Sequence, residues 1–326
     1  KMIQGLGRRG VLLGAPAVLA GTGSARAQAW PSRPVRILVG FAAGGANDIM
    51  ARLLAQKLTE RIPGSSFIVE NRPGAATQVA AEAAARATPD GTTFFYTSPS
   101  TLIALAVNRS ATLDPVQALA PVFLAQNSPL ALVCRPDFPA RTVAEFIALA
   151  RERQGRLTVS TPGAGAINHL ALVLLMRQTG IEATHVPYSG NQPSITALIR
   201  GDVDVAHDGL FAPRAQLEAS TLRAIAVTSA ERAPAYPNVP TFAETVPGHV
   251  VGFWGGMFAP RGTPDPILDR MNTELNAIMR LPDAIERTRS FGAEPAGGDR
   301  AAFARTVAED WARWTQVVRE NDIRPT

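Results

Sequence analysis

Three loops of the chain carry residue types that can hold a small anion. The first is Gly44-Gly45-Ala46-Asn47-Asp48, the second is the hydroxyl-rich segment 97–101, and the third is the glycine-rich segment 163–169. Each follows a strand-like run, and the first and third open a helical pattern. Free amide groups and the positive dipole end of a helix attract carboxylates or phosphates, and serine and threonine hydroxyls add hydrogen-bond donors. The pattern indicates anion binding without a cationic side chain.

The same residues also have structural interpretations. A Gly-Gly turn before a helix is most often a plain connection, with Asn47 or Asp48 as the helix cap. A lone histidine such as His169, in the first turn of its helix, is more often a structural hydrogen-bonding residue than a catalyst. Asp208 can hold a hydroxyl or ammonium group, or cap the helix after it. Cys134 lies in an apolar run, so we expect a buried core thiol.

Alternating strand and helix patterns must position these loops. Strands are expected at 35–39, 66–70 and 92–97, then near 129–134, 157–160, 183–187, 203–207 and 222–228. Helices are expected after the first strand, at 75–87, and near 142–153, 166–179, 192–200 and 212–218, and they dominate from 264 onward. The alternation predicts an α/β fold with parallel sheets covered on both faces, whose ligands bind at the carboxyl ends of strands.

Composition and charge narrow the classes of function. The 326 residues are 46% hydrophobic and 18% charged, as in a globular protein, and the length favours two domains. Positive residues in 1–27 supply most of the net charge of +5, so a nucleic-acid surface is not expected. Arg8-Arg9, a short apolar stretch and Ala25-Arg26-Ala27 predict a signal peptide cleaved near residue 27, of twin-arginine or general secretory type. We therefore expect a periplasmic protein.

Ordered motifs along the chain resemble the Bug family. They are Trp30-Pro-Ser-Arg-Pro-Val-Arg-Ile, Gly-Gly-x-x-Asp48, Val69-Glu-Asn-Arg-Pro-Gly74, Pro89-Asp-Gly91, His185-Val-Pro-Tyr-x-Gly190, Gly201-Asp-Val-Asp204, Leu222-Arg-Ala-Ile-Ala-Val-Thr228, Pro237-Asn-Val-Pro-Thr241, Phe258-Ala-Pro260 and Gly292-Ala-Glu294. The motifs run in order from about residue 30 to 323. Bug proteins are TctC-like periplasmic solute-binding receptors of tripartite tricarboxylate transporters.

The resemblance implies a two-domain type II periplasmic binding protein fold. Each domain is then a mixed, mostly parallel sheet flanked by helices, with domain I at 30–128 plus 252–326, domain II at 129–251, and the ligand cleft between them. The implied protein is a receptor, not an enzyme, that closes on a small carboxylate. The implied ligand-binding residues are Phe41, Ala43, Gly44, Gly45, Asn47, Asp48, Thr97, Ser98, Ser100, Thr101, Gly163, Ala164, Gly165, Ala166, Asn168, His169, Tyr188 and Asp208.

Two departures from the family pattern bear on the ligand. The first loop reads Gly40-Phe-Ala-Ala-Gly-Gly where Pro-Phe-Pro-Pro-Gly-Gly is common, and Ala166 stands where a serine is usual. A hydroxyl contact is therefore missing from the third loop, and Asn168 is a candidate substitute donor. Dicarboxylates, tricarboxylates, aromatic acids and other small carboxylates all stay open as ligands. Trp254 can either reach the cleft or pack in the core.

A periplasmic α/β hydrolase-like enzyme is the alternative function. The chain has no Gly-x-Ser-x-Gly motif, and its four histidines lack the close spacing of zinc sites, so we expect no catalytic residues, no metal and no cofactor. An inert structural or assembly protein is a third class, disfavoured by the many polar loops at strand ends. We expect a monomer whose partners are a carboxylate and either membrane transporter subunits, for uptake, or a sensor.

Overall fold

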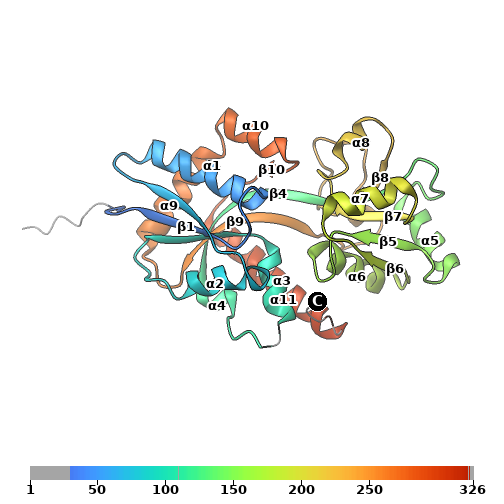
Figure 1. Cartoon of the computed structure of the whole chain (residues 1–326), viewed down its shortest axis with the longest axis horizontal. Coiled ribbons are helices and arrows are strands. Elements are labelled where there is room, and N and C mark those ends of the chain that lie inside the picture. Colours follow the sequence, from blue (N-terminus) through green and yellow to red (C-terminus); the bar gives the residue numbers. More distant parts are fainter. Residues whose placement is uncertain (1–29, 109, 322, 324–326) are drawn as a thin grey trace, which may run out of the picture.

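The computed structural model describes residues 30–108, 110–321 and 323. The signal peptide expected at 1–27 lies outside these residues. Two lobes, joined by strands that run between them, make up the described chain (Figure 1). None of the helices described here is both long enough and apolar enough to cross a membrane.

The first lobe is built on the sheet order β2-β1-β3-β9-β4. Its strands are β1 (Val35–Val39), β2 (Phe67–Asn71), β3 (Thr93–Thr97), β9 (Gly252–Pro260), the first part of β4 (Leu119–Cys134) and β10 (Glu294–Pro295). β1 pairs in parallel with β2 and β3, whereas β9 pairs antiparallel with β3 and β4. The helical segments are α1 (Ala46–Arg61), η1 (Ala75–Thr77), α2 (Gln78–Ala85), α3 (Pro99–Val107), α4 (Pro115–Ala118), α9 (Asp265–Ile278), α10 (Pro282–Ser290) and α11 (Arg300–Glu320).

The second lobe continues the sheet as β4-β7-β5-β6, with β8 also paired to β4. Its own strands are β5 (Thr158–Thr161), β6 (Thr184–Pro187), β7 (Val205–Gly209) and β8 (Arg223–Val227). β5 pairs in parallel with β6 and β7, and β4 runs antiparallel to β7 and β8. The helical segments are α5 (Val143–Arg153), α6 (Ile167–Thr179), α7 (Asn191–Arg200), α8 (Arg214–Glu218) and η2 (Phe242–Glu244).

β4 and β9 form the crossing between the lobes. Their ladder ends with Pro129 opposite Gly252, and from Leu130 onward β4 pairs with β7 instead. Thr228 braces this point: its buried hydroxyl accepts from the Leu130 amide at 3.1 Å and donates to the Val251 carbonyl at 2.6 Å. A buried side-chain bridge of this kind satisfies backbone groups where one ladder gives way to another.

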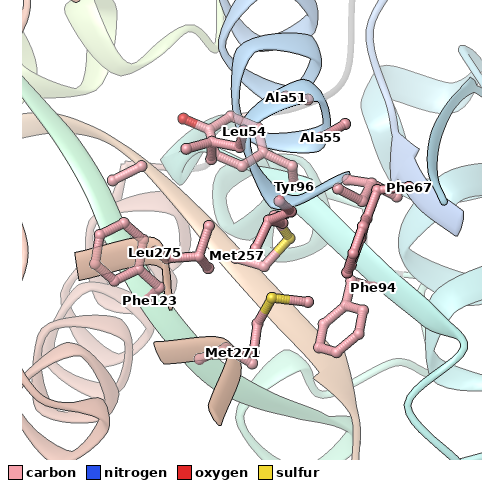
Figure 2. Close-up of a cluster of buried hydrophobic side chains, with 14 of the residues drawn as sticks. Ala51, Leu54, Ala55, Phe67, Phe94, Tyr96, Phe123, Met257, Met271 and Leu275 are labelled. Atoms are coloured by element: carbon pink, nitrogen blue, oxygen red, sulfur yellow. The ribbon is translucent and has the colours of Figure 1, made fainter. Parts of the chain in front are cut away.

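Apolar faces of the sheet and helices form the cores. In the first lobe, Met257 of β9 packs with Phe94, Tyr96 and Phe123 against Leu275 of α9 (Figure 2). Such interdigitated burial stabilises a domain by about 25 cal/mol for each Å² of apolar surface removed from water. A separate apolar cluster joins α3, α6 and α11, and therefore spans both lobes.

The buried thiol expected at Cys134 is confirmed, and the structure decides between the two alternatives for Trp254. Cys134 is buried, and burial raises the pKa of its thiol to about 11. Trp254 packs in the core, where its Nε1 donates to Asp310 Oδ2 at 2.7 Å. Trp314 is buried and docks α11 against the α3–α6 cluster.

The structure corrects other expectations. The helix expected at 75–87 is split into η1 and α2, and the hydroxyl-rich loop at 97–101 contains the start of α3. The parallel pairs follow from the alternation of strands and helices, and the antiparallel pairs, all of which involve β4 or β9, make the sheet mixed, as the family resemblance implies. β4 is 16 residues long, whereas the sequence predicted a strand only near 129–134, at its carboxyl end. The strand is longer because it pairs with strands of both lobes. Strand length of this kind is set by pairing partners far away in sequence and not by local pattern.

Candidate functional site

A cavity of about 740 Å³, the interlobe cleft, lies between the lobes. The first lobe lines it with the β1–α1 loop, the segment around η1 and one face of α3, and the second lobe adds the β5–α6 loop. The complete lining is Gly40, Phe41, Ala42, Gly74, Ala75, Thr77, Gln78, Ser100, Ile103, Ala104, Val107, Asn108, Ala164, Gly165 and Ala166. Of the residues expected to bind ligand, the structure thus brings together Phe41, Ser100, Ala164, Gly165 and Ala166.

Asp48 fixes the conformation of the β1–α1 loop through hydrogen bonds. Its buried carboxylate accepts hydrogen bonds from the Gly44 amide at 2.8 Å, Arg52 Nε at 2.9 Å and Asn71 Nδ2 at 2.8 Å. Asn71 Nδ2 also donates to the Phe41 carbonyl at 3.0 Å. Burial by itself raises the pKa of Asp48, but these donors together hold the pKa below its ordinary value. Asp48 therefore fixes the loop that carries Phe41 into the cleft.

The expected helix cap at Asn47 or Asp48 is wrong. The N-cap of α1 is Gly45, and no side chain accepts a hydrogen bond there. Asp48 lies inside the helix and reaches back to the Gly44 amide, which precedes the cap. Asn47 is buried, and its Oδ1 has no partner among the described residues. Ala43, Gly44 and Gly45 are exposed and lie outside the cleft lining.

A strained segment around η1 forms a wall that sequence reasoning missed. Ala75 and Thr77 have φ values of 43° and 82°, a region that a β-branched threonine rarely adopts. A Cβ at Gly40 would lie 2.6 Å from Thr77 Cβ, so only glycine allows the first loop to pack this closely on the segment. Strain of this kind tends to collect at functional sites. The available signal was the Asn-Arg-Pro-Gly74 turn, which places the segment directly after a strand end.

The hydroxyl-rich segment contributes to the cleft the hydroxyl of Ser100, which makes no hydrogen bond with the described residues. Thr97, Thr101 and Thr77 form a chain of hydroxyl contacts, at 2.5 Å between the first two and 2.6 Å between the last two. Ser98 is fully buried, and its hydroxyl has no partner among the described residues. Ser100 is partly exposed and lines the cleft, whereas Thr97, Ser98 and Thr101 do not.

One face of α3 was also missed. Ile103, Ala104 and Val107 follow Ser100 at helical spacing and line the cleft with it. This helical spacing is visible in the sequence, but the hydroxyl-rich composition of 97–101 predicts a loop. Asn108, at the end of the helix, donates to Gln78 Oε1 at 2.7 Å, and Gln78 Nε2 donates to the Ala104 carbonyl at 3.1 Å. These amides are therefore satisfied within the protein.

His169 shapes the second-lobe loop. Its Nδ1 accepts from the Gly165 amide at 3.1 Å, which requires that nitrogen to be unprotonated. Its ring stacks on His185, with centroids 3.9 Å apart and an interplanar angle of 6°. Burial lowers the pKa of both imidazoles, and that of His185 falls to about 4 with the neighbouring His169 as a second cause. His169 is thus a hydrogen-bonding residue of the loop, and it lies with Gly163 just outside the lining.

The remaining second-lobe residues that were expected to bind ligand lie outside the lining of the cleft. Asn168 is buried, and its carbonyl accepts from His207 Nδ1 at 2.9 Å. Asp208 is fully buried at the end of β7, where Oδ1 accepts from Asn191 Nδ2 and, at 2.7 Å, from the Gly209 amide. Burial raises the pKa of Asp208 to about 7 against these hydrogen bonds. Asp208 does not cap α8, whose N-cap is Pro213. Tyr188 is partly buried against the second-lobe core, outside the lining.

The described lining of the cleft is polar only through hydroxyl, amide and backbone groups. Its described lining contains no charged side chain and no histidine. The described residues contain no group of three or more His, Cys, Asp or Glu side chains that could hold a metal ion. Within the same residues, the one hydroxyl that contacts a histidine ring is that of Thr161, 2.7 Å from His185 Nε2, and it is fully buried.

Comparison with known proteins decides the family. The sequence profile of TctC, the tripartite tricarboxylate transporter family receptor, matches residues 50–323. The chain belongs to the TctC family. It is 35% identical to the UPF0065 protein in the tcbD-tcbE intergenic region of Pseudomonas sp. (strain P51), over 98% of this chain and 96% of that protein. The TctC assignment confirms the resemblance to Bug receptors.

Two solved structures extend the comparison. Rpa4515 of R. palustris with adipate is 36% identical, with a TM-score of 0.73, and the alignment covers 91% of this chain and all of that one, 100%. MatC (Rpa3494) from Rhodopseudomonas palustris with bound malate is 32% identical, with a TM-score of 0.70 and coverage of 89% and 100%. The likeness to the periplasmic binding protein BugD, at 29% identity, a TM-score of 0.70 and coverage of 91% and 100%, confirms the periplasmic binding protein fold. The TctC chain is therefore a solute-binding receptor.

Proposed function

We propose that this receptor captures a small carboxylate in the interlobe cleft and closes its lobes around it. The observation that carries the proposal is a cleft lined by loops of both lobes, with glycines, a free Ser100 hydroxyl and no charged side chain among its described residues. Both R. palustris relatives were solved with a carboxylate. No observation favours the hydrolase alternative.

The amino end of α6 supports a carboxylate seat in this cleft. Its N-cap is Ala166, which lines the cleft and provides no side-chain cap. The first amides of a helix have no acceptor within the helix, and the helix dipole favours an anion beside them. Gly165 does not contribute its amide, because that group donates to His169.

The crossing strands support a hinge. We propose that domain I comprises 30–128 plus 252–326 and domain II comprises 129–251, because the β4–β9 ladder ends at Pro129 and Gly252. Closure then rotates the lobes about this crossing and removes water from the bound carboxylate. We propose a periplasmic monomer that delivers its ligand to membrane transporter subunits or reports it to a sensor. BugD, which is 29% identical, is described as a periplasmic binding protein.

The test is thermal unfolding of protein stripped of ligand by unfolding and refolding. Mono-, di-, tri- and aromatic carboxylates are added at fixed pH and salt. A ligand at 100 times its dissociation constant stabilises the folded state by about 2.7 kcal/mol, which corresponds to a rise of several degrees.

Matched variants place the binding in the cleft. Ala164→Leu extends a side chain into the cleft and is expected to remove the shift, whereas Ala219→Leu adds the same atoms at an exposed position of the second lobe and is expected to keep it. If no carboxylate of the panel raises the unfolding temperature, the carboxylate proposal is contradicted. A shift that survives Ala164→Leu places the ligand elsewhere.

A further inference from the structure

Among the described lining side chains of the interlobe cleft, few polar groups are free to bind a ligand. Among its described lining side chains, Thr77, Gln78 and Asn108 already make hydrogen bonds within the protein. Ser100 alone makes none with the described residues. An internally satisfied polar group gains little from a ligand, since its existing hydrogen bond must first be broken.

The rest of the described lining is apolar. Phe41, Ile103 and Val107 supply the large side chains, and the alanines of both lobes supply the remainder. The Ile103 and Val107 wall continues into the apolar cluster that joins α3, α6 and α11. This wall favours a ligand body that loses no hydrogen bonds when it is removed from water, which means an alkyl or aryl group.

A second carboxylate on the ligand would meet no charged side chain and no further free hydroxyl among the described lining residues of the cleft. Positions 164 and 166 are both alanine, and the second-lobe loop therefore presents no hydroxyl to the cleft from either position. Burying an ionised carboxylate without a paired donor is strongly unfavourable. One charged end can use the Ser100 hydroxyl and backbone amides, but a second or third lies against hydrocarbon.

We propose that the ligand is a carboxylate with a single charged end and an apolar alkyl or aryl body. This inference rests on the proposed carboxylate-binding function and specifies the class of ligand. It separates this receptor from MatC, solved with the compact and polar diacid malate, and from Rpa4515, solved with the longer diacid adipate.

Calorimetric titration of ligand-free protein tests the proposal with matched acids. Hexanoate and adipate have the same number of carbons and differ in the second carboxylate. Hexanoate is expected to bind at least about tenfold more tightly than adipate, because the second carboxylate loses its hydration. In the series from acetate to hexanoate, each added CH₂ is expected to increase affinity up to about fourfold. Benzoate tests the aryl body, and citrate is expected not to bind.

A one-carbon deletion locates the apolar wall. Ile103→Val is expected to weaken hexanoate binding by about two- to fourfold and to leave acetate binding unchanged. Ile199→Val makes the same deletion at an exposed position of α7 and is expected to change neither. Tighter binding of adipate or citrate than of hexanoate overturns the inference while the carboxylate function stands. Failure of every acid to bind overturns both, and equal loss in the two valine variants overturns the assignment of the wall.

Discussion

The two buried carboxylates Asp48 and Asp208 should respond very differently to neutralisation at pH 7. Asp48 accepts from Arg52 and two further donors, and its pKa is lowered, so the folded protein stabilises the charged form. Asp208 accepts from neutral donors only, one of its oxygens has no partner among the described residues, and its pKa is raised to about 7. Each is buried, and asparagine has nearly the same shape as aspartate. The comparison therefore isolates charge from packing.

The magnitudes follow from these contacts. Asp48→Asn exchanges an acceptor oxygen for an amide that faces other donors, and we expect it to lower the free energy of unfolding by about 2–4 kcal/mol at pH 7. Asp208→Asn replaces a carboxyl that is already half protonated at that pH, and we expect a change within about 1 kcal/mol. Since each kcal/mol shifts Tm by about 2–4 °C in proteins of somewhat smaller size, the two variants are readily distinguished.

The two carboxylates give the stability of the protein opposite dependences on pH. The folded pKa of Asp48 lies below its ordinary value of 3.8, so its contribution is present above pH 3.8 and is lost as the pH falls through the folded pKa. The folded pKa of Asp208 lies above 3.8, so its protonated form favours folding at low pH and this advantage is lost as the pH rises toward 7. Asp208→Asn should therefore gain stability relative to the parent between pH 4 and pH 7.

Urea unfolding of ligand-free protein at pH 4, 5.5 and 7 measures both effects. Equal destabilisation by Asp48→Asn and Asp208→Asn at pH 7 would refute the reasoning, because it would mean that the donors around Asp48 do not stabilise its charge. A constant difference between Asp208→Asn and the parent across the pH range would contradict the raised pKa of Asp208.

Two further predictions concern the contact between Gly292 of the first lobe and Phe211 of the second, and the buried His207. Gly292 has a φ of 75°, and a Cβ there would lie 2.0 Å from Phe211 Cβ, so Gly292→Ala should destabilise by about 1–3 kcal/mol. A double-mutant cycle with Phe211→Ala should recover part of this loss, and strict additivity would argue against the contact. Burial lowers the pKa of His207 to about 4, so its contribution to stability is present above 6.5 and is lost as the pH falls toward 4. His207→Gln should make the fall in urea-measured stability over that range shallower, and an unchanged slope would contradict the assignment.

Local pattern was enough to predict most of the parallel α/β units. The β1–α1, β5–α6 and β6–α7 segments alternate between a two-residue and a 3.6-residue hydrophobic period, and the structure forms them close to the expected bounds. The family resemblance implies ligand-binding loops after β1 and β5, and both loops line the cleft. Strand ends are readable from sequence because they coincide with glycine and hydroxyl-rich turns.

Local sequence pattern did not predict the conformation of η1 or which side chains at the start of α3 are buried. Thr77 adopts a positive φ that its own preferences oppose, and the structure retains it through the Thr101 hydroxyl and close packing on Gly40. Ser98 and Thr101 have the composition of a binding loop, yet both are buried. Exposure of a side chain depends on neighbours brought in by the fold, which residue type alone does not specify.

The sequence by itself determined the family, the alternation of strands and helices, and the chemistry available at the loops, because these depend on residue type and short-range spacing. The tertiary structure decided which of those residues meet. Asp48 became the support of a loop, Asp208 a buried carboxyl, and Ile103 a wall of the cleft. These roles arise because β4 and β9 pair across more than a hundred residues of sequence and set two lobes against each other, and only that long-range pairing fixes which side chains line the space between them.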